Sequence, residues 1–198
     1  LAGRWPHPLK PTRKAFLGIG LAFTRTPGGR SIYDQPIDVA ELQQRIDRYY
    51  QPYHCALTRT IERFRALFGF VWHLNCHSMP SRAISGLPNG ERRPDFCLGD
   101  RHGTTCTRAL TELVADYLNR LGYRVTVNEP YAGVEIVRRY GQPHRGIHSL
   151  QLEINRDLYM DESSAEIHAG FDVLRQHLSA LVEHMLDAAR DRMDVAPE

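Results

Sequence analysis

The sequence predicts an α/β fold, in which the strands of a central sheet alternate with helices. Three observations support this prediction. An apolar run from Phe70 to Leu74 ends abruptly in polar residues, as buried strands of such sheets do. Two long stretches, 38–68 and 167–185, repeat apolar residues every three or four positions, which is the period of an amphipathic helix. Short runs at 96–98, 123–128 and 148–156 have the length and residue types of strands.

The first third of the chain is predicted to contain one strand and one long helix. Residues 1–15 are rich in proline without an apolar period, so we expect a loop there. Residues 16–26 predict a strand that closes at the turn Pro27-Gly28-Gly29. A helix should begin at Asp38, kink at Pro52 and end at Gly69. Its stripe of aromatic and aliphatic residues is expected to lie in the core.

Loops, short strands and two helices are predicted for the remainder. Residues 82–94 form a loop, 96–98 a strand, and Thr104 or Thr105 caps a helix that runs to Leu121. Strands are expected at 123–128, 134–140 and 148–156. The run Ser163-Ser164-Ala165-Glu166 resembles a capping box for the closing helix, and the tail from 191 to 198 should fray.

Composition excludes several classes of function. The chain has 25 basic and 23 acidic residues, and the basic ones are scattered, so nucleic acid is not expected as a partner. No apolar run approaches the roughly 20 residues that cross a bilayer, and the amino end has no hydrophobic signal core, so we expect a cytoplasmic protein without membrane contact. The four cysteines form no C-x-x-C pair, which favours reduced thiols. The sequence leaves the oligomeric state open.

Candidate functional residues follow the predicted strands. His77 lies in the polar cluster after Leu74, where ligands bind in open α/β sheets, and it could bind a metal or act as a base. Asp100, Arg101 and His102 occupy a strand-to-helix loop, where they could meet a substrate or only stabilise the loop. An arginine at 138 or 139 could clamp a carboxylate with two hydrogen bonds.

Glu153 is the candidate carboxylate. On a central strand its burial requires a partner, a metal or a role in proton transfer, whereas on an edge strand it would face solvent.

Five stretches together resemble one family, the N-formylglutamate amidohydrolases, in order and spacing across roughly residues 30–185. They are Asn75-Cys76-His77-Ser78-Met79-Pro80-Ser81, Leu98-Gly99-Asp100-Arg101-His102-Gly103-Thr104-Thr105-Cys106, Pro130-Tyr131-Ala132-Gly133, Arg138-Arg139-Tyr140-Gly141-Gln142-Pro143, and Gln151-Leu152-Glu153-Ile154-Asn155-Arg156 with Tyr159-Met160-Asp161-Glu162.

The resemblance implies a mixed sheet flanked by helices, similar to zinc carboxypeptidases and aspartoacylases. It implies a Zn²⁺-dependent amidohydrolase that cleaves N-formyl-L-glutamate, or a similar N-acyl acidic amino acid, to formate and glutamate in histidine degradation. His77 would bind the metal and Glu153 would be the general base. Arg138 would bind a substrate carboxylate, with Asp100, Arg101 and His102 as further substrate-binding residues.

The resemblance also bears on the extent of the chain. We expect one amidohydrolase domain over 1–198, in which 1–29 matches poorly. Relatives carry two further metal ligands upstream, which 1–69 does not match, so the chain is expected to be truncated at its amino end. Relatives also tend to carry Asp at the position of Asn75, and Gly with an aromatic residue at Val134-Glu135.

Three classes of function therefore stand at this point. The first is the zinc amidohydrolase. The second is a non-catalytic relative that binds an acidic amino acid, which the unmatched metal ligands favour. The third is a cysteine hydrolase that pairs Cys76 or Cys106 with His77 or His102. Alternation along a strand places Cys76 and His77 on opposite faces, which argues against that pair.

Overall fold

The computed structural model describes residues 5, 12–26, 29–82 and 92–194. Its contacts divide the chain into two compact units, 1–59 and 60–198. The expectation of a single domain stays a prediction.

In its described residues the first unit consists of helices and turns. The loop predicted for residues 1–15 is wrong from Arg13 onward, where a short helix begins. The helices of this unit are α1 (Arg13–Phe16), α2 (Val39–Arg45), the π-helical turn η1 (Ile46–Tyr50) and the start of α3 (Gln51–Phe68). The strand predicted for 16–26 is wrong. The backbone turns at Gly18, whose φ is +76° and whose carbonyl accepts from the amides of Thr24 and Arg25. Only isolated bridges, such as Ile19 to Phe23, form there, and the predicted turn residues 27–28 lie outside the described residues.

The predicted long helix is confirmed from Asp38 to Phe68. The π-helical turn η1 ends at Tyr50, two residues before Pro52, whose missing N–H removes a regular backbone bond at that point. Gly69 ends the helix with φ +75°. The prediction that the whole stripe lies in the core is wrong, because Tyr49 and Tyr53 in the first unit are more than half exposed.

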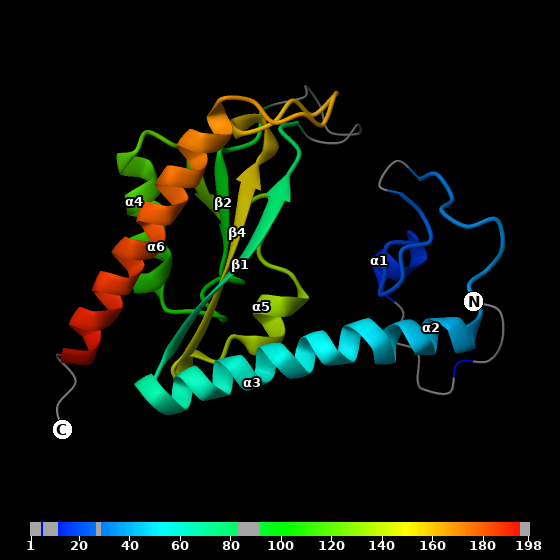
Figure 1. The fold of residues 1–198 in the computed structure, drawn as a ribbon, viewed down its shortest axis with the longest axis horizontal. Coiled ribbons are helices and arrows are strands. Elements are labelled where there is room, and N and C mark those ends of the chain that lie inside the picture. Colours follow the sequence, from blue (N-terminus) through cyan, green and yellow to red (C-terminus); the bar gives the residue numbers. More distant parts are fainter. Residues whose placement is uncertain (1–4, 6–11, 27–28, 83–91, 195–198) are drawn as a thin grey trace. The chain divides into compact units, whose positions relative to one another are not determined.

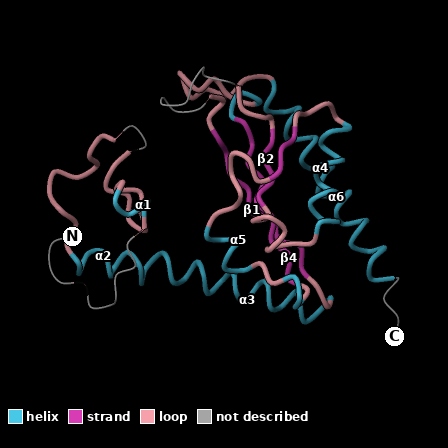
Figure 2. Tube along the Cα trace, turned by 180° about the vertical axis from the view of Figure 1, so that it is seen from behind, coloured by secondary structure: helices cyan, strands magenta, loops and turns pink. Residues whose placement is uncertain are grey.

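A four-stranded mixed sheet forms the centre of the second unit (Figures 1 and 2), which confirms the predicted α/β class. The strands are β1 (Val71–Met79), β2 (Phe96–Gly99), β3 (Val125–Val127) and β4 (Ile147–Asn155), in the order β1-β4-β2-β3. β1 is parallel to β4 and β3 is parallel to β2, whereas β2 and β4 are antiparallel. Three of the predicted strands are therefore confirmed at 96–98, 123–128 and 148–156.

β1 differs from its prediction in length and position. It does not end at Leu74 but continues through the polar cluster to Met79, because β4 pairs with it in register along all nine residues. β1 is also an edge strand and is mostly half-buried, whereas the sequence predicted a buried strand. His77 therefore lies within the strand and not after it.

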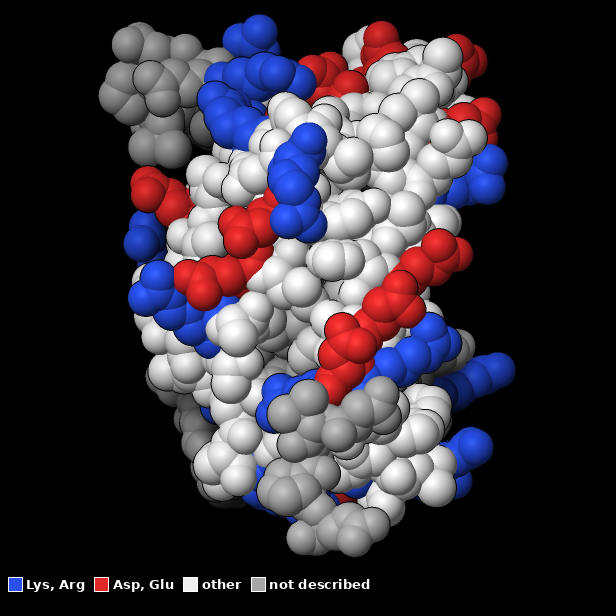
Figure 3. All heavy atoms as spheres, turned by 90° about the vertical axis from the view of Figure 1, so that its left-hand side faces the viewer, with Lys and Arg blue, Asp and Glu red and all other residues white. Residues whose placement is uncertain are grey.

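Two helices, α4 (Arg108–Arg120) and α6 (Gly170–Asp194), cover one face of the sheet (Figures 1 and 2). The core between them and the sheet consists of these buried residues: Phe96, Leu98, Cys106, Leu110, Val114, Leu118, Leu150, Leu152, Leu174, Leu181 and Met185. Figure 3 shows their outer surface, where acidic and basic side chains lie among large uncharged areas. No helix of the described residues is long and apolar enough to span a lipid bilayer.

Several helix boundaries correct the sequence predictions. α4 begins after Thr107, because residues 100–105 form a loop closed by bonds to the carbonyl of Asp100. The expected capping box at 163–166 is wrong, since Asp161 Oδ1 accepts from the amides of Ser163 and Ser164 and holds a separate turn. α6 starts only at Gly170 and continues to Asp194, past the predicted start of the frayed tail; residues 195–198 lie outside the described part.

The strand predicted for 134–140 is also wrong. Glu135–Tyr140 form the helix α5, which packs against β4 on the face opposite to α4 and α6 (Figures 1 and 2). Val137 and Tyr140 are its buried residues, three positions apart, as expected for one side of a helix.

Candidate active site

The sheet register brings two predicted site residues together. His77 on β1 lies directly opposite Glu153 on β4. Paired residues of neighbouring strands point to the same face, so the imidazole and the carboxylate are side by side. β4 is a central strand and Glu153 is only 5% exposed, which excludes the alternative of a solvent-facing carboxylate.

Glu153 is held in an environment suited to proton transfer. Burial raises the pKa of its carboxyl group, whereas the charge of His77, a hydrogen bond from Gln151 and the charges of Arg93 and Arg156 lower it. The Gln151 amide donates to Glu153 Oε1 at 2.7 Å. A raised pKa makes a carboxylate a stronger base, which favours proton transfer from water.

His77 has one hydrogen-bond partner on its own strand. The Asn75 side-chain nitrogen lies 2.9 Å from His77 Nε2. The two nitrogens are within hydrogen-bond distance, and the roles of the His77 ring nitrogens depend on its tautomer. Asn75 thus contacts the candidate metal ligand directly. Position 75 is the one at which relatives were expected to carry Asp.

A zinc ion fits this site only in part. A catalytic zinc takes three protein ligands. His77 and Glu153 supply one imidazole and one carboxylate, and nowhere in the described parts of the chain do three His, Cys, Asp or Glu side chains gather closely enough to hold a metal ion.

Further polar residues continue the same face of the sheet. His73 Nδ1 is 2.8 Å from Ser149 Oγ, and burial lowers the pKa of His73, which favours its neutral form. Gln151 also accepts from the backbone N–H of Val134 at 2.8 Å through its Oε1. Sequence reasoning did not assign roles to His73, Ser149 or Gln151. The signal that could have identified them is a polar residue at every second position in 73–77 and in 149–153.

Arg93 and Arg156 were likewise not identified as site residues. Their charges act on Glu153, although neither lies on a strand. Arg156 follows β4 directly and Arg93 precedes β2, which runs antiparallel to it. The antiparallel pairing of β2 and β4 places Arg93 and Arg156 at the same end of these two strands. This pairing was not predicted from the sequence.

The loop with Asp100, Arg101 and His102 lies at the other end of β2. Gly99 pairs with Gln151, so this loop is displaced toward the start of β4. The Asp100 carboxylate accepts from Gly103 N, Thr111 Oγ1 and Asn128 Nδ2 at 2.7–3.0 Å.

The other two residues of this loop differ in exposure. Arg101 donates to the Gly133 carbonyl, while His102 is exposed. Their substrate-binding roles, like that of Asp100, stay predictions.

Arg138 is on α5, where its guanidinium donates twice to the Glu135 carboxylate, at 2.6 and 2.7 Å. Both side chains are more than half exposed. The structure therefore does not bring Arg138 into contact with His77 or Glu153, and its role as a substrate-carboxylate binder also stays a prediction.

The cysteines do not form a nucleophile–base pair with these histidines. Cys76 lies opposite Leu152 in the register, on the other face from His77. Cys106 is 1% exposed, and burial raises the pKa of its thiol to about 11. Such a thiol is protonated at neutral pH and is a poor nucleophile.

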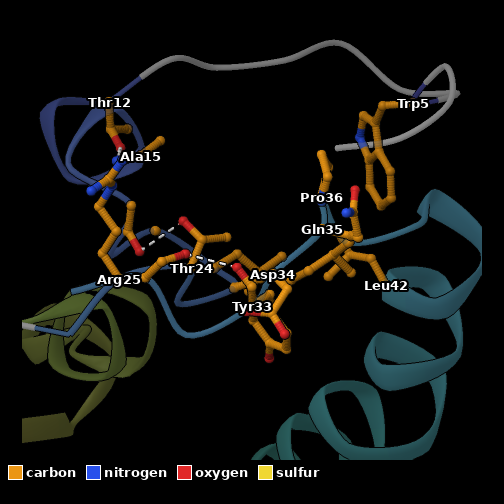
Figure 4. Close-up of a pocket in the computed structure, with 16 residues that line it drawn as sticks. Trp5, Thr12, Ala15, Thr24, Arg25, Tyr33, Asp34, Gln35, Pro36 and Leu42 are labelled. Carbon is orange, nitrogen blue, oxygen red and sulfur yellow. Dashed lines mark hydrogen bonds between the residues drawn. The ribbon is translucent and has the colours of Figure 1, made fainter. Parts of the chain in front are cut away.

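The first unit has a pocket of its own, of about 800 Å³ (Figure 4). Trp5, Arg25, Asp34 and Leu42 are among the residues around it. None of the predicted site residues lines this pocket.

Comparisons with known proteins identify the family of this chain. A model of the N-formylglutamate amidohydrolase family matches residues 4–160. The N-formylglutamate deformylase of Pseudomonas aeruginosa is 31% identical over 169 residues, which cover 83% of this chain and 63% of that protein. That of Pseudomonas putida is 35% identical over 124 residues, which cover 62% of this chain and 46% of that protein. The chain thus spans less than two thirds of the length of either relative.

A solved structure has the same fold. The crystal structure of N-formylglutamate amidohydrolase from Ralstonia eutropha is 44% identical and has a TM-score of 0.89, over 96% of this chain and 68% of that one. The extent of the family match and this agreement in fold show that the chain belongs to the N-formylglutamate amidohydrolase family.

Proposed function

We propose that this protein hydrolyses the amide bond of N-formyl-L-glutamate, or of a similar N-acyl acidic amino acid, in a zinc-dependent reaction. The products are formate and glutamate, and the reaction belongs to histidine degradation in the cytoplasm. Family membership supports the reaction class. The observation that carries the proposal is the buried Glu153 carboxylate in register with His77 on the neighbouring strand.

Glu153 is the proposed general base and acid. An amide is a weak electrophile with a poor leaving group, so its hydrolysis needs an activated water and a proton for the nitrogen. Glu153 takes a proton from water as the oxygen adds to the formyl carbon. It returns that proton to the nitrogen as the C–N bond breaks, which leaves formate and the free amine.

Zinc dependence is part of the proposal, with His77 as one ligand. In hydrolases of this kind zinc lowers the pKa of a bound water and polarises the carbonyl. The described residues offer fewer than the three ligands of a catalytic site. Arg138, Asp100, Arg101 and His102 remain proposed substrate-binding residues.

Formate release from N-formyl-L-glutamate tests the reaction. We expect the full chain with added zinc to release formate, and Glu153→Gln to be slower by about 10²- to 10⁴-fold, the range that general acid–base catalysis supplies. Glu112→Gln, an exposed carboxylate on α4, is the matched control and should keep full activity. Absence of formate from folded, zinc-loaded protein contradicts the proposed reaction and favours a binding protein.

Zinc binding is tested separately by equilibrium dialysis. His77→Ala should weaken zinc binding by more than about 100-fold. Even mutation of residues that only hydrogen-bond to metal ligands lowers metal affinity by about 10- to 100-fold. His144→Ala removes an exposed imidazole and serves as control. Equal zinc affinity of the two variants excludes His77 as a ligand.

A further inference from the structure

The two oxygens of the Glu153 carboxylate have different surroundings. The last torsion of a glutamate side chain is soft, so a carboxylate without partners rotates and exchanges its two oxygens. In Glu153, Oε1 accepts a hydrogen bond from Gln151 Nε2 at 2.7 Å. Among the described residues no group donates to Oε2, and Oε2 is not one of the unpartnered atoms that are cut off from solvent. Oε1 is therefore held, whereas Oε2 is open to water.

Gln151 is itself held in one orientation. It lies two residues before Glu153 on β4, so both side chains point to the same face of the sheet, and it is fully buried. Its Oε1 accepts from the backbone N–H of Val134 at 2.8 Å. A backbone N–H can only donate, so the oxygen of the Gln151 amide must face Val134 and its nitrogen must face Glu153.

The N–H of Val134 follows directly after Pro130-Tyr131-Ala132-Gly133, a stretch that received no role from the sequence. The Cys97 thiol donates to the carbonyl of Tyr131 at 3.4 Å. Cys97 also lies opposite Glu153 in the register of β2 and β4, so their side chains share a face. The stretch is thus attached to the same face of the sheet that carries the carboxylate.

Close packing fixes this stretch again at the end of β2. A Cβ atom at Gly99 would lie 2.6 Å from Gly133 N and 2.8 Å from the carbonyl carbon of Ala132, so only glycine allows this approach. The backbone N–H of Arg101 donates to Ala132 O at 2.8 Å, and its guanidinium donates to Gly133 O at 3.1 Å. The N–H of Val134 therefore belongs to an anchored backbone.

We propose that Gln151 is a positioning residue for the general base: it holds Oε1 of Glu153 and leaves Oε2 to take the proton from water and return it to the amide nitrogen. This inference rests on the proposed function. In this role Gln151 acts through Glu153 and not on the substrate. Without Gln151 the carboxylate rotates, and fewer of its orientations aim a lone pair at the water, which slows the chemical step.

Gln151→Met tests the assignment by kinetics, because methionine has a similar length but no N–H to donate. On N-formyl-L-glutamate its kcat should fall by about 10- to 100-fold, as expected for loss of a hydrogen bond to a charged group. KM should stay nearly unchanged, because the contacts to the substrate are retained. Ser149→Ala removes another buried polar group from the same face of β4, and this matched control should keep the wild-type kcat.

A double variant separates positioning from a general structural role. In the Glu153→Gln background, Gln151→Met should cause no further loss of kcat, because no carboxylate is left to position. Damage to the fold would lower kcat in both backgrounds. Equal losses in the two backgrounds, or a raised KM with an unchanged kcat, overturn the assignment.

A spectroscopic measurement needs neither turnover nor a folded Gln151→Met variant. The side-chain amide protons of Gln151 are observed by NMR in ¹⁵N-labelled protein and assigned through their proximity to the Val134 N–H. A hydrogen bond to a carboxylate is stronger than one to a neutral amide, so the bonded proton should move upfield in Glu153→Gln and stay in place in Ser149→Ala. An unmoved resonance in Glu153→Gln refutes the inference even if formate is released. A resonance that moves, in a wild-type chain that releases no formate, supports the held carboxylate and contradicts only the proposed reaction.

Discussion

The two faces of the sheet are built from the same strands, but one buries apolar side chains and the other buries polar ones. On β4, Leu150 and Leu152 point into the core beneath α4 and α6, whereas Gln151 and Glu153 point to the opposite face. All four residues are fully or almost fully buried. On the first face burial removes apolar area from water and stabilises the fold. On the second face it desolvates polar groups, which costs stability unless they are hydrogen-bonded and which prepares Glu153 for proton transfer.

The largest expected effect is a loss of stability at Leu152, the neighbour of Glu153 on β4. Leu152→Ala should lower the free energy of unfolding by about 3 kcal/mol, because it removes buried methyl groups and leaves a cavity in the core. Leu152 is 1% exposed and belongs to the main cluster. Urea denaturation followed by circular dichroism measures this change.

Glu153→Gln is the counterpart on the opposite face. A carboxyl group whose pKa is raised on folding makes the fold less stable at pH values above that pKa. Glutamine does not ionise, so at pH 8 the variant should be as stable as the wild type or slightly more stable. A stability loss as large as that of Leu152→Ala would show that Glu153 holds the fold and would remove the contrast between the faces.

A smaller effect is expected at the loop beyond β2. Asp100→Ala leaves three buried or half-buried donors without their acceptor, namely Gly103 N, Thr111 Oγ1 and Asn128 Nδ2. The free energy of unfolding should fall by about 2 kcal/mol. Asp116→Ala, an exposed position on α4, should change it by less than about 0.5 kcal/mol. Unchanged stability of Asp100→Ala with a raised KM would instead place Asp100 on the substrate-binding side.

Much of the framework was predictable from local patterns. The helix from Asp38 to Phe68 and the strand around Glu153 follow from periodicity alone, and Gly69 and Gly122 end their helices with positive φ. The run 134–140 was misassigned because its six helical residues are too few to show a helical period. The strand predicted at 16–26 fails because the backbone turns at Gly18, a local conformation that alternation does not reveal.

The site was predictable residue by residue but not as an arrangement. His77 and Glu153 were proposed separately, and only the register of β1 and β4 shows that they face each other. Arg93 could not be found from sequence, because its proximity to Glu153 depends on the antiparallel pairing of β2 and β4. Arg138 fits the carboxylate-binding pattern by type, but its contact with Glu135 arises from the helix that the sequence did not predict.

The smallest expected effect concerns the thiols. It tests whether the chemistry is confined to the face of the sheet that carries Glu153. Cys106 and Cys97 are buried, and the pKa of Cys106 is raised to about 11, so at pH 8 only about one Cys106 thiol in a thousand is ionised. Iodoacetamide at pH 8 should therefore label the exposed Cys55 fastest and spare Cys97 and Cys106, as peptide mass spectrometry measures. Cys76 is exposed too but should react more slowly than Cys55, because burial raises the pKa of its thiol. Because Cys76 pairs with Leu152 on the face away from Glu153, Cys76→Ser should release formate at the wild-type rate. Loss of activity in Cys76→Ser, with stability retained, would restore the cysteine hydrolase hypothesis and show that the chemistry is not confined to the polar face.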